Sequence, residues 1–125
     1  MERSFAKEVK QLRLGQGETF HGEGILAVTK ALLQSGISYV GGYQGAPISH
    51  LMDVLVDAED LLSELGVHLE TSTSEAAAAA MLGASINYPL RGAVTWKSTV
   101  GTNVASDALS NLASAGVTGG AMIVL

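Results

Sequence analysis

The chain has 125 residues, enough for one domain with a core, and its formal net charge of −5 without a lysine or arginine run argues against a nucleic-acid partner. Hydrophobic residues make up 47% of the chain, which is high for a lone domain and suggests that some apolar surface meets another domain or subunit. The absence of cysteine excludes disulfides, thiolate zinc sites and cysteine-bound iron–sulfur clusters within this chain.

Residues 1–19 are polar and weakly patterned, and we interpret them as a lead-in segment. Their charges do not fit a secretory signal, and no apolar run of the chain is long enough to cross a membrane. We therefore expect a cytoplasmic protein without a membrane partner.

Helices and strands alternate along the remaining residues. The spacing of apolar residues predicts helices over 22–35, 50–65, 75–87 and 103–115, and short apolar runs predict strands over 37–41, 67–70, 92–96 and 121–125. Short connections between such elements are typical of an α/β fold, in which helices cover both faces of a parallel sheet. The sequence ends inside an apolar run, so we expect residues 20–125 to be an incomplete domain.

Glu75 is the first candidate functional residue. It stands between the polar cluster TSTS at 71–74 and an alanine-rich helix that has no polar face, so we expect that helix to be covered on every side. Ser72-x-x-Glu75 matches a capping box, and because such boxes are common the pattern favours a structural role. Alternatively, the carboxyl group hydrogen-bonds a ligand, because open parallel sheets bind ligands at the carboxyl ends of their strands.

Two further polar, glycine-containing loops follow predicted strands. Residues 42–49 (GYQGAPIS) have neither a Walker lysine nor GxGxxG spacing, so phosphate binding is weakly supported, and merely turning the chain is the more frequent role of such a loop. In the segment 96–103 (WKSTVGTN), Thr102 or Asn103 is a candidate helix cap. Together the three junctions predict one shared edge of the sheet.

The remaining polar residues suggest little chemistry. The three histidines, His21, His50 and His68, lack the i, i+4 spacing of a metal site, and no GxSxG nucleophile motif occurs. We expect the acidic residues of the 50–65 helix to form its solvated face: Asp53, Asp57, Glu59, Asp60 and Glu64.

Several segments together resemble the 2-oxoacid:ferredoxin oxidoreductases, in particular the alpha subunits of the indolepyruvate members. The resemblance begins at about Leu14 and rests on RLGQGETFHGEGILAVTKALLQSG, GYQGAPIS, SEAAAAAMLGAS and VTWKSTVGTNVASDALSNLASAGVTGG. The last of these segments is the most specific. The resemblance implies that residues 20–125 are the pyrimidine-binding domain of a thiamine diphosphate enzyme.

The resemblance also implies roles for individual residues. Glu75 would be catalytic, facing N1′ of the aminopyrimidine and sharing a proton that favours the 4′-imino tautomer. Residues expected to bind the cofactor are Glu75, Gly45, Pro47, Lys97, Gly101 and Asn103, and those expected on the substrate side are Gln44, Ala46 and Ser49. Relatives usually carry a threonine in the first loop, but positions 44, 46 and 48 are Gln, Ala and Ile here, so that hydroxyl donor is missing.

Other parts of such an enzyme are missing from this sequence. The family's Gly-Asp-Gly motif for Mg²⁺ and diphosphate does not occur, nor do its cluster cysteines, so Mg²⁺ and [4Fe-4S] clusters are expected in another domain or subunit of an oligomer. The complete enzyme would convert an aryl pyruvate, pass electrons to ferredoxin and the acyl group to coenzyme A, and the isolated chain would be inactive. The alternatives are a non-redox thiamine diphosphate decarboxylase or ketol transferase, and a non-catalytic flavodoxin-like binding domain.

Overall fold

Four parallel strands form the centre of the fold. A computed structural model of the chain describes residues 3–125, with the strands in the order β2-β1-β3-β4. Their bounds are β1 Tyr39–Gly42, β2 His68–Thr71, β3 Arg91–Thr95 and β4 Gly120–Val124. In the middle of the sheet, Val40 pairs with Leu69 on one side and with Ala93 on the other. The predicted parallel sheet is confirmed.

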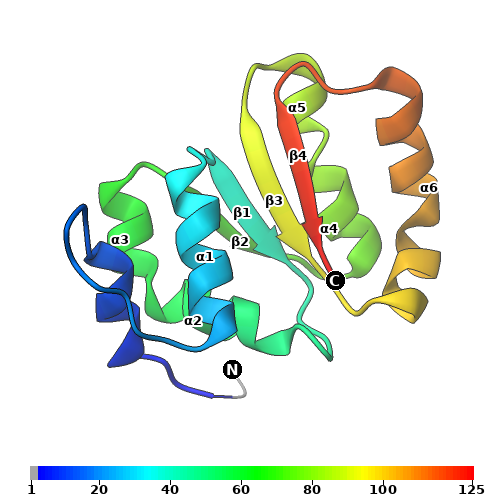
Figure 1. Cartoon of the computed structure of the whole chain (residues 1–125). Coiled ribbons are helices and arrows are strands. Elements are labelled where there is room, and N and C mark those ends of the chain that lie inside the picture. The colour runs from blue at the N-terminus through cyan, green and yellow to red at the C-terminus, as the bar shows by residue number, and fades with distance from the viewer. Residues whose placement is uncertain (1–2) are drawn as a thin grey trace.

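Helices cover both faces of this sheet, as the sequence predicts (Figure 1). Their bounds are α1 Gly24–Gln34, α2 Ser49–Asp57, α3 Glu59–Glu64, α4 Glu75–Met81, α5 Ala84–Asn87 and α6 Thr99–Ala115, with a 3-10 helix η1 at Glu8–Arg13. On one face Val40 packs with Leu51 and Leu55 of α2. On the other face Trp96 packs with Leu82 and with the alanines of α4. Among residues 3–125, no helix is both long and apolar enough to span a membrane.

Three predicted helices differ from the structure. The 50–65 helix bends at Ala58, whose ψ of 12° leaves the helical range. The 75–87 helix is interrupted at Leu82 and Gly83, and glycine is a residue type that weakens helix interiors. The last helix begins at Thr99, one turn earlier than expected. Strand β2 is largely exposed, because it lies at the edge of the sheet and pairs only with β1.

The lead-in segment packs against the α1–α2 side of the fold. Phe5 and Leu12 are almost fully buried with Ala58, so the bend between α2 and α3 makes room for the segment. The backbone amides of Arg3 and Phe5 donate to the carboxylates of Asp53 and Asp57 respectively.

The predicted solvated face of the 50–65 helix is therefore wrong at Asp53, which is only 1% exposed. Its carboxylate accepts hydrogen bonds from the Arg3 amide at 3.0 Å and from Gln44 Nε2 at 3.0 Å, and it pairs with His50 Nδ1 at 3.1 Å. The lead-in segment, the first loop and α2 thus all form hydrogen bonds with this one buried carboxylate. The exposed positions of Glu59, Asp60 and Glu64 are as expected.

Replacing Asp53 by Asn tests this anchor. The asparagine side chain has one oxygen and one NH2 group, so its NH2 group faces at least one of the groups that donate to Asp53. Such a buried donor without an acceptor costs about 1–3 kcal/mol. We expect the free energy of unfolding, measured by urea denaturation, to fall by about that amount. The exposed Asp107 of α6 is the matched control, since Asp107→Asn should change it by less than about 0.5 kcal/mol. Equal effects of the two substitutions would contradict the anchor.

Candidate active site

The carboxyl ends of β1, β2 and β3 meet at one edge of the sheet, as the sequence predicts. The amide of Ser72 donates to the carbonyl of Gly42 at 2.8 Å, and the amide of Tyr43 donates to the carbonyl of Thr95 at 3.0 Å. These bonds continue the sheet pairing just past the strands. The loops that contain Gln44 and Lys97, and the loop that leads into Glu75, therefore start side by side (Figure 1).

Glu75 is the first residue of α4, but it is not part of a capping box. Ser74 caps the helix, because its Oγ accepts a hydrogen bond from the amide of Ala77 at 3.1 Å. Ser72 instead donates to Sδ of Met81 at 3.3 Å. The capping-box interpretation is thus wrong. The Glu75 side chain is half-buried and forms no hydrogen bond or ion pair with residues 3–125.

Gly101 and Trp96 form the immediate surroundings of Glu75. A Cβ atom placed on Gly101 would lie 3.0 Å from Cγ of Glu75 and 2.7 Å from Cδ1 of Trp96. The Trp96 ring is fully buried, and its Nε1 donates to Oγ1 of Thr102 at 3.1 Å. The glycine therefore lets α6 approach both side chains closely.

Thr102 and Asn103 do not cap α6. The N-cap residue is Ser98, and Thr102 lies inside the first turn, where its hydroxyl donates to the carbonyl of Ser98 at 2.6 Å. Thr102 thus fixes the Trp96 ring, a role that the sequence pattern did not indicate. Asn103, an expected cofactor-binding residue, is exposed on α6.

Lys97 and Gly45 meet on the other side of the end of β3. A Cβ atom on Gly45 would lie 2.7 Å from Cβ of Lys97, so the first loop packs directly on the base of the lysine side chain. The Lys97 side chain is exposed. The structure therefore brings together Glu75 with Gly101, and Gly45 with Lys97, as two adjoining groups at one edge.

The expected substrate-side residues are held in different ways. Gln44 Nε2 donates to the carbonyl of Ser49 at 3.1 Å and to Oδ1 of Asp53, so both of its amide hydrogens are used. Ser49 is only 5% exposed at the start of α2. Ala46 and Pro47 are exposed at the tip of the loop.

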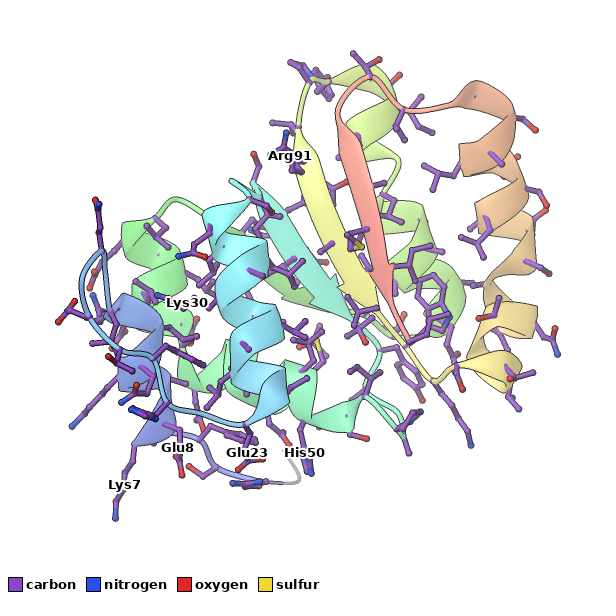
Figure 2. The ribbon with its side chains drawn as sticks, in the orientation of Figure 1. Lys7, Glu8, Glu23, Lys30, His50 and Arg91 are labelled. Atoms are coloured by element: carbon purple, nitrogen blue, oxygen red, sulfur yellow. The ribbon has the colours of Figure 1, made fainter. Side chains whose placement is uncertain are left out.

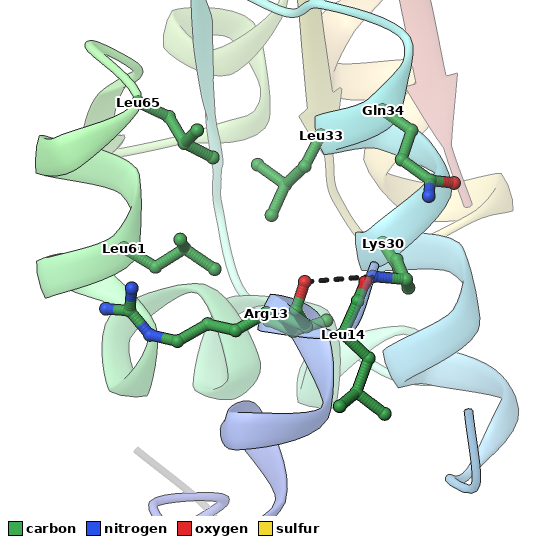
Figure 3. A pocket seen from close by; sticks show the side chains of 8 residues that line it. Arg13, Leu14, Lys30, Leu33, Gln34, Leu61 and Leu65 are labelled. Carbon is green, nitrogen blue, oxygen red and sulfur yellow. Dashed lines mark hydrogen bonds between the residues drawn. The ribbon is translucent and has the colours of Figure 1, made fainter. Parts of the chain in front are cut away.

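A surface pocket also lies between η1, α1 and α3 (Figure 3), lined chiefly by leucines such as Leu33, Leu61 and Leu65. Its cations are already engaged: Lys30 Nζ donates to the carbonyls of Leu12 and Leu14, and Arg13 forms two hydrogen bonds with Glu64. The hydrogen bonds from Arg13 lower the pKa of Glu64. These contacts tie η1 to its neighbours.

At the edge opposite the candidate site, polar side chains donate to backbone carbonyls, and a surface pocket lined by Ser38, Arg91 and Thr118 lies beside them. Arg91 begins β3 and donates to the carbonyl of Ser35, and Figure 2 shows it far from His50, which lies near the start of α2. Ser85 is fully buried there and donates to the carbonyls of Leu90 and Gly120, at 2.8 and 3.0 Å. The candidate site is assigned to the carboxyl edge because Glu75, Gly101 and Lys97 meet there.

Comparison with known proteins supports the family resemblance. The chain is 32% identical over 114 residues to indolepyruvate oxidoreductase subunit IorA of Methanothermobacter marburgensis, and 34% identical over 115 residues to that of Archaeoglobus fulgidus. The alignments cover 91% and 90% of this chain but 18% of each relative. No family model matches the chain, and no solved structure matches it. The chain is thus a distant homologue of indolepyruvate oxidoreductase subunit IorA and spans about a fifth of that subunit's length.

Proposed function

We propose that this chain is the part of a thiamine diphosphate-dependent 2-oxoacid:ferredoxin oxidoreductase that binds the aminopyrimidine ring of the cofactor. The observation that carries the proposal is the Glu75 carboxyl group, which lies at the carboxyl edge of the sheet without a partner among residues 3–125. Distant homology to IorA adds support, because the name of that subunit indicates an oxidoreductase.

The residues around Glu75 suit a flat, nitrogen-containing ring. Ser74 satisfies the helix end, so the neighbouring carboxyl group is not needed for capping. Because Gly101 has no side chain, α6 packs closely against both Glu75 and the buried Trp96. A half-buried carboxyl group beside apolar neighbours hydrogen-bonds a ring nitrogen more strongly than a fully hydrated one does.

In the proposed reaction Glu75 holds a proton that it shares with N1′ of the aminopyrimidine. When bound, thiamine diphosphate supplies the nucleophilic carbon and the electron sink for decarboxylation of a 2-oxo acid. The task of this chain is to orient the ring and to keep that proton at the carboxyl oxygen. Gly101 and the Trp96 ring, which is fixed by Thr102, lie beside the Glu75 side chain.

The rest of the activity is assigned to other parts of the enzyme. Because the chain spans 18% of its relatives, binding of Mg²⁺ and diphosphate, the [4Fe-4S] clusters, ferredoxin and coenzyme A are proposed for another domain or subunit. An aryl pyruvate is the proposed substrate, by analogy with the indolepyruvate of the relatives' name. The alternative of a structural Glu75 in a non-catalytic domain is weakened, because Ser74 forms the cap.

Glu75→Gln is the first test. In the complete enzyme saturated with thiamine diphosphate, we expect turnover of phenylpyruvate to fall by at least about 100-fold, because an amide cannot share the proton. The free energy of unfolding should change by less than about 1 kcal/mol. The control is Glu59→Gln, since Glu59 is exposed and also begins a helix. Near-normal turnover with reduced stability would show that Glu75 is only structural.

Gly101→Ala tests the close approach of α6. Its methyl group would force Trp96 or Glu75 to move, so we expect the affinity of the complete enzyme for thiamine diphosphate, measured by calorimetry, to fall at least about 10-fold. Gly24→Ala is the matched control, because nothing lies within 4 Å of a Cβ at this helical glycine. Unchanged cofactor affinity in the Gly101 variant would contradict the proposed ring site.

A further inference from the structure

The loops at the carboxyl edge contain one positively charged residue, Lys97. We propose that Lys97, together with the backbone amides of residues 44–46, binds the carboxylate of the 2-oxo acid substrate. This inference rests on the proposed function and names a substrate-binding group within the same site. It replaces the cofactor contact that the family resemblance implied for Lys97.

The backbone places Lys97 and Glu75 on opposite sides of the end of β3. Successive residues of an extended strand point to opposite faces. The Trp96 ring turns toward α4 and α6, next to Glu75 and Gly101. Lys97 follows it, and its Cβ faces the first loop at Gly45. A cofactor ring beside Glu75 therefore leaves Lys97 on the neighbouring side, where a second molecule can approach.

The first loop offers hydrogen-bond donors on that neighbouring side. The backbone amides of Gln44, Gly45 and Ala46 have no acceptor among residues 3–125. Free backbone amides in a loop can donate hydrogen bonds to an anion. Gly45 lies against the base of the Lys97 side chain, and this side chain is long enough for its ammonium group to reach a ligand bound at these amides.

The loop is held firmly enough to keep those donors in place. Gln44 is tied through its side chain to Ser49 and to the buried Asp53, and the amide of Ile48 donates to the carbonyl of Gly45 at 3.1 Å. These bonds consume the side-chain donors of Gln44. The backbone amides, Lys97 and the hydroxyl group of the exposed Tyr43 are thus donors that remain for a ligand at this loop.

Charge favours the same assignment. The chain carries a net charge of −5, so its overall field repels an anionic substrate. Lys97 forms no ion pair with residues 3–125, and no carboxylate neutralises it there. A carboxylate ligand would supply the missing partner through charge-assisted hydrogen bonds. Lys97 therefore selects for the acid over an uncharged ketone.

Lys97→Met tests the assignment in the complete, cofactor-saturated enzyme. We expect the KM for phenylpyruvate to rise about 10- to 100-fold, the loss typical of a hydrogen bond to a charged group. The affinity for thiamine diphosphate and the KM for uncharged phenylpyruvamide should stay within about 2-fold of the unaltered enzyme. Lys97→Arg should restore most of the affinity for phenylpyruvate, because it keeps the positive charge.

Lys10→Met, at an exposed lysine of η1, is the matched control and should leave both KM values unchanged. An unchanged KM for phenylpyruvate in the Lys97→Met enzyme would overturn the inference, as would a loss of cofactor affinity with that KM unaltered. Neither result bears on the proposed function, which is tested by the turnover of the Glu75→Gln enzyme. Near-normal turnover in the Glu75→Gln enzyme would instead remove the proposed function and leave the KM comparison intact.

Discussion

The close approach of backbones at the carboxyl end of β1 determines where the candidate site forms. Gly41 and Gly42 pair with residues of both neighbouring strands. A Cβ atom on Gly41 would lie 2.0 Å from the carbonyl oxygen of Glu70, and one on Gly42 would lie 2.1 Å from that of Thr95. Gly42 also has a φ of 155°, which other residues rarely adopt. Without these two glycines the strand ends would separate, and so would the loops that follow them.

The shared edge could be predicted from the sequence because it follows from the fold class. Parallel strands direct all their carboxyl ends to one edge, so polar loops after three strands had to lie near one another. The cap of α4 could not be predicted in the same way. Ser72 and Ser74 are both suitable caps, and only the residue at which the helix begins distinguishes them. In the structure the helix begins at Glu75, so Ser74 is the cap and the Glu75 carboxyl group is not needed for capping.

Asp53 was missed for a related reason. A charged residue on a helix with several acids resembles part of a solvated face, but its neighbours Met52 and Val54 are both buried. A helix whose adjacent residues are all apolar is covered nearly all round, and this was the available signal. The donors that make burial possible come from the lead-in segment and the first loop, about fifty and nine residues away in sequence. No local pattern contains such contacts.

The two sides of the end of β3 divide the chemistry of the site. One side is apolar, with Trp96 buried and Glu75 beside it, which suits a ring that exchanges a proton with a carboxyl group. The other side has donors and a positive charge, which suit an anion. Glu75 is only half-buried within the described residues, and the nearby Val100 and Val104 of α6 are 59% and 50% exposed. Water at Glu75 would compete for the shared proton, so the proposed chemistry requires that this apolar side of the site be covered during the reaction.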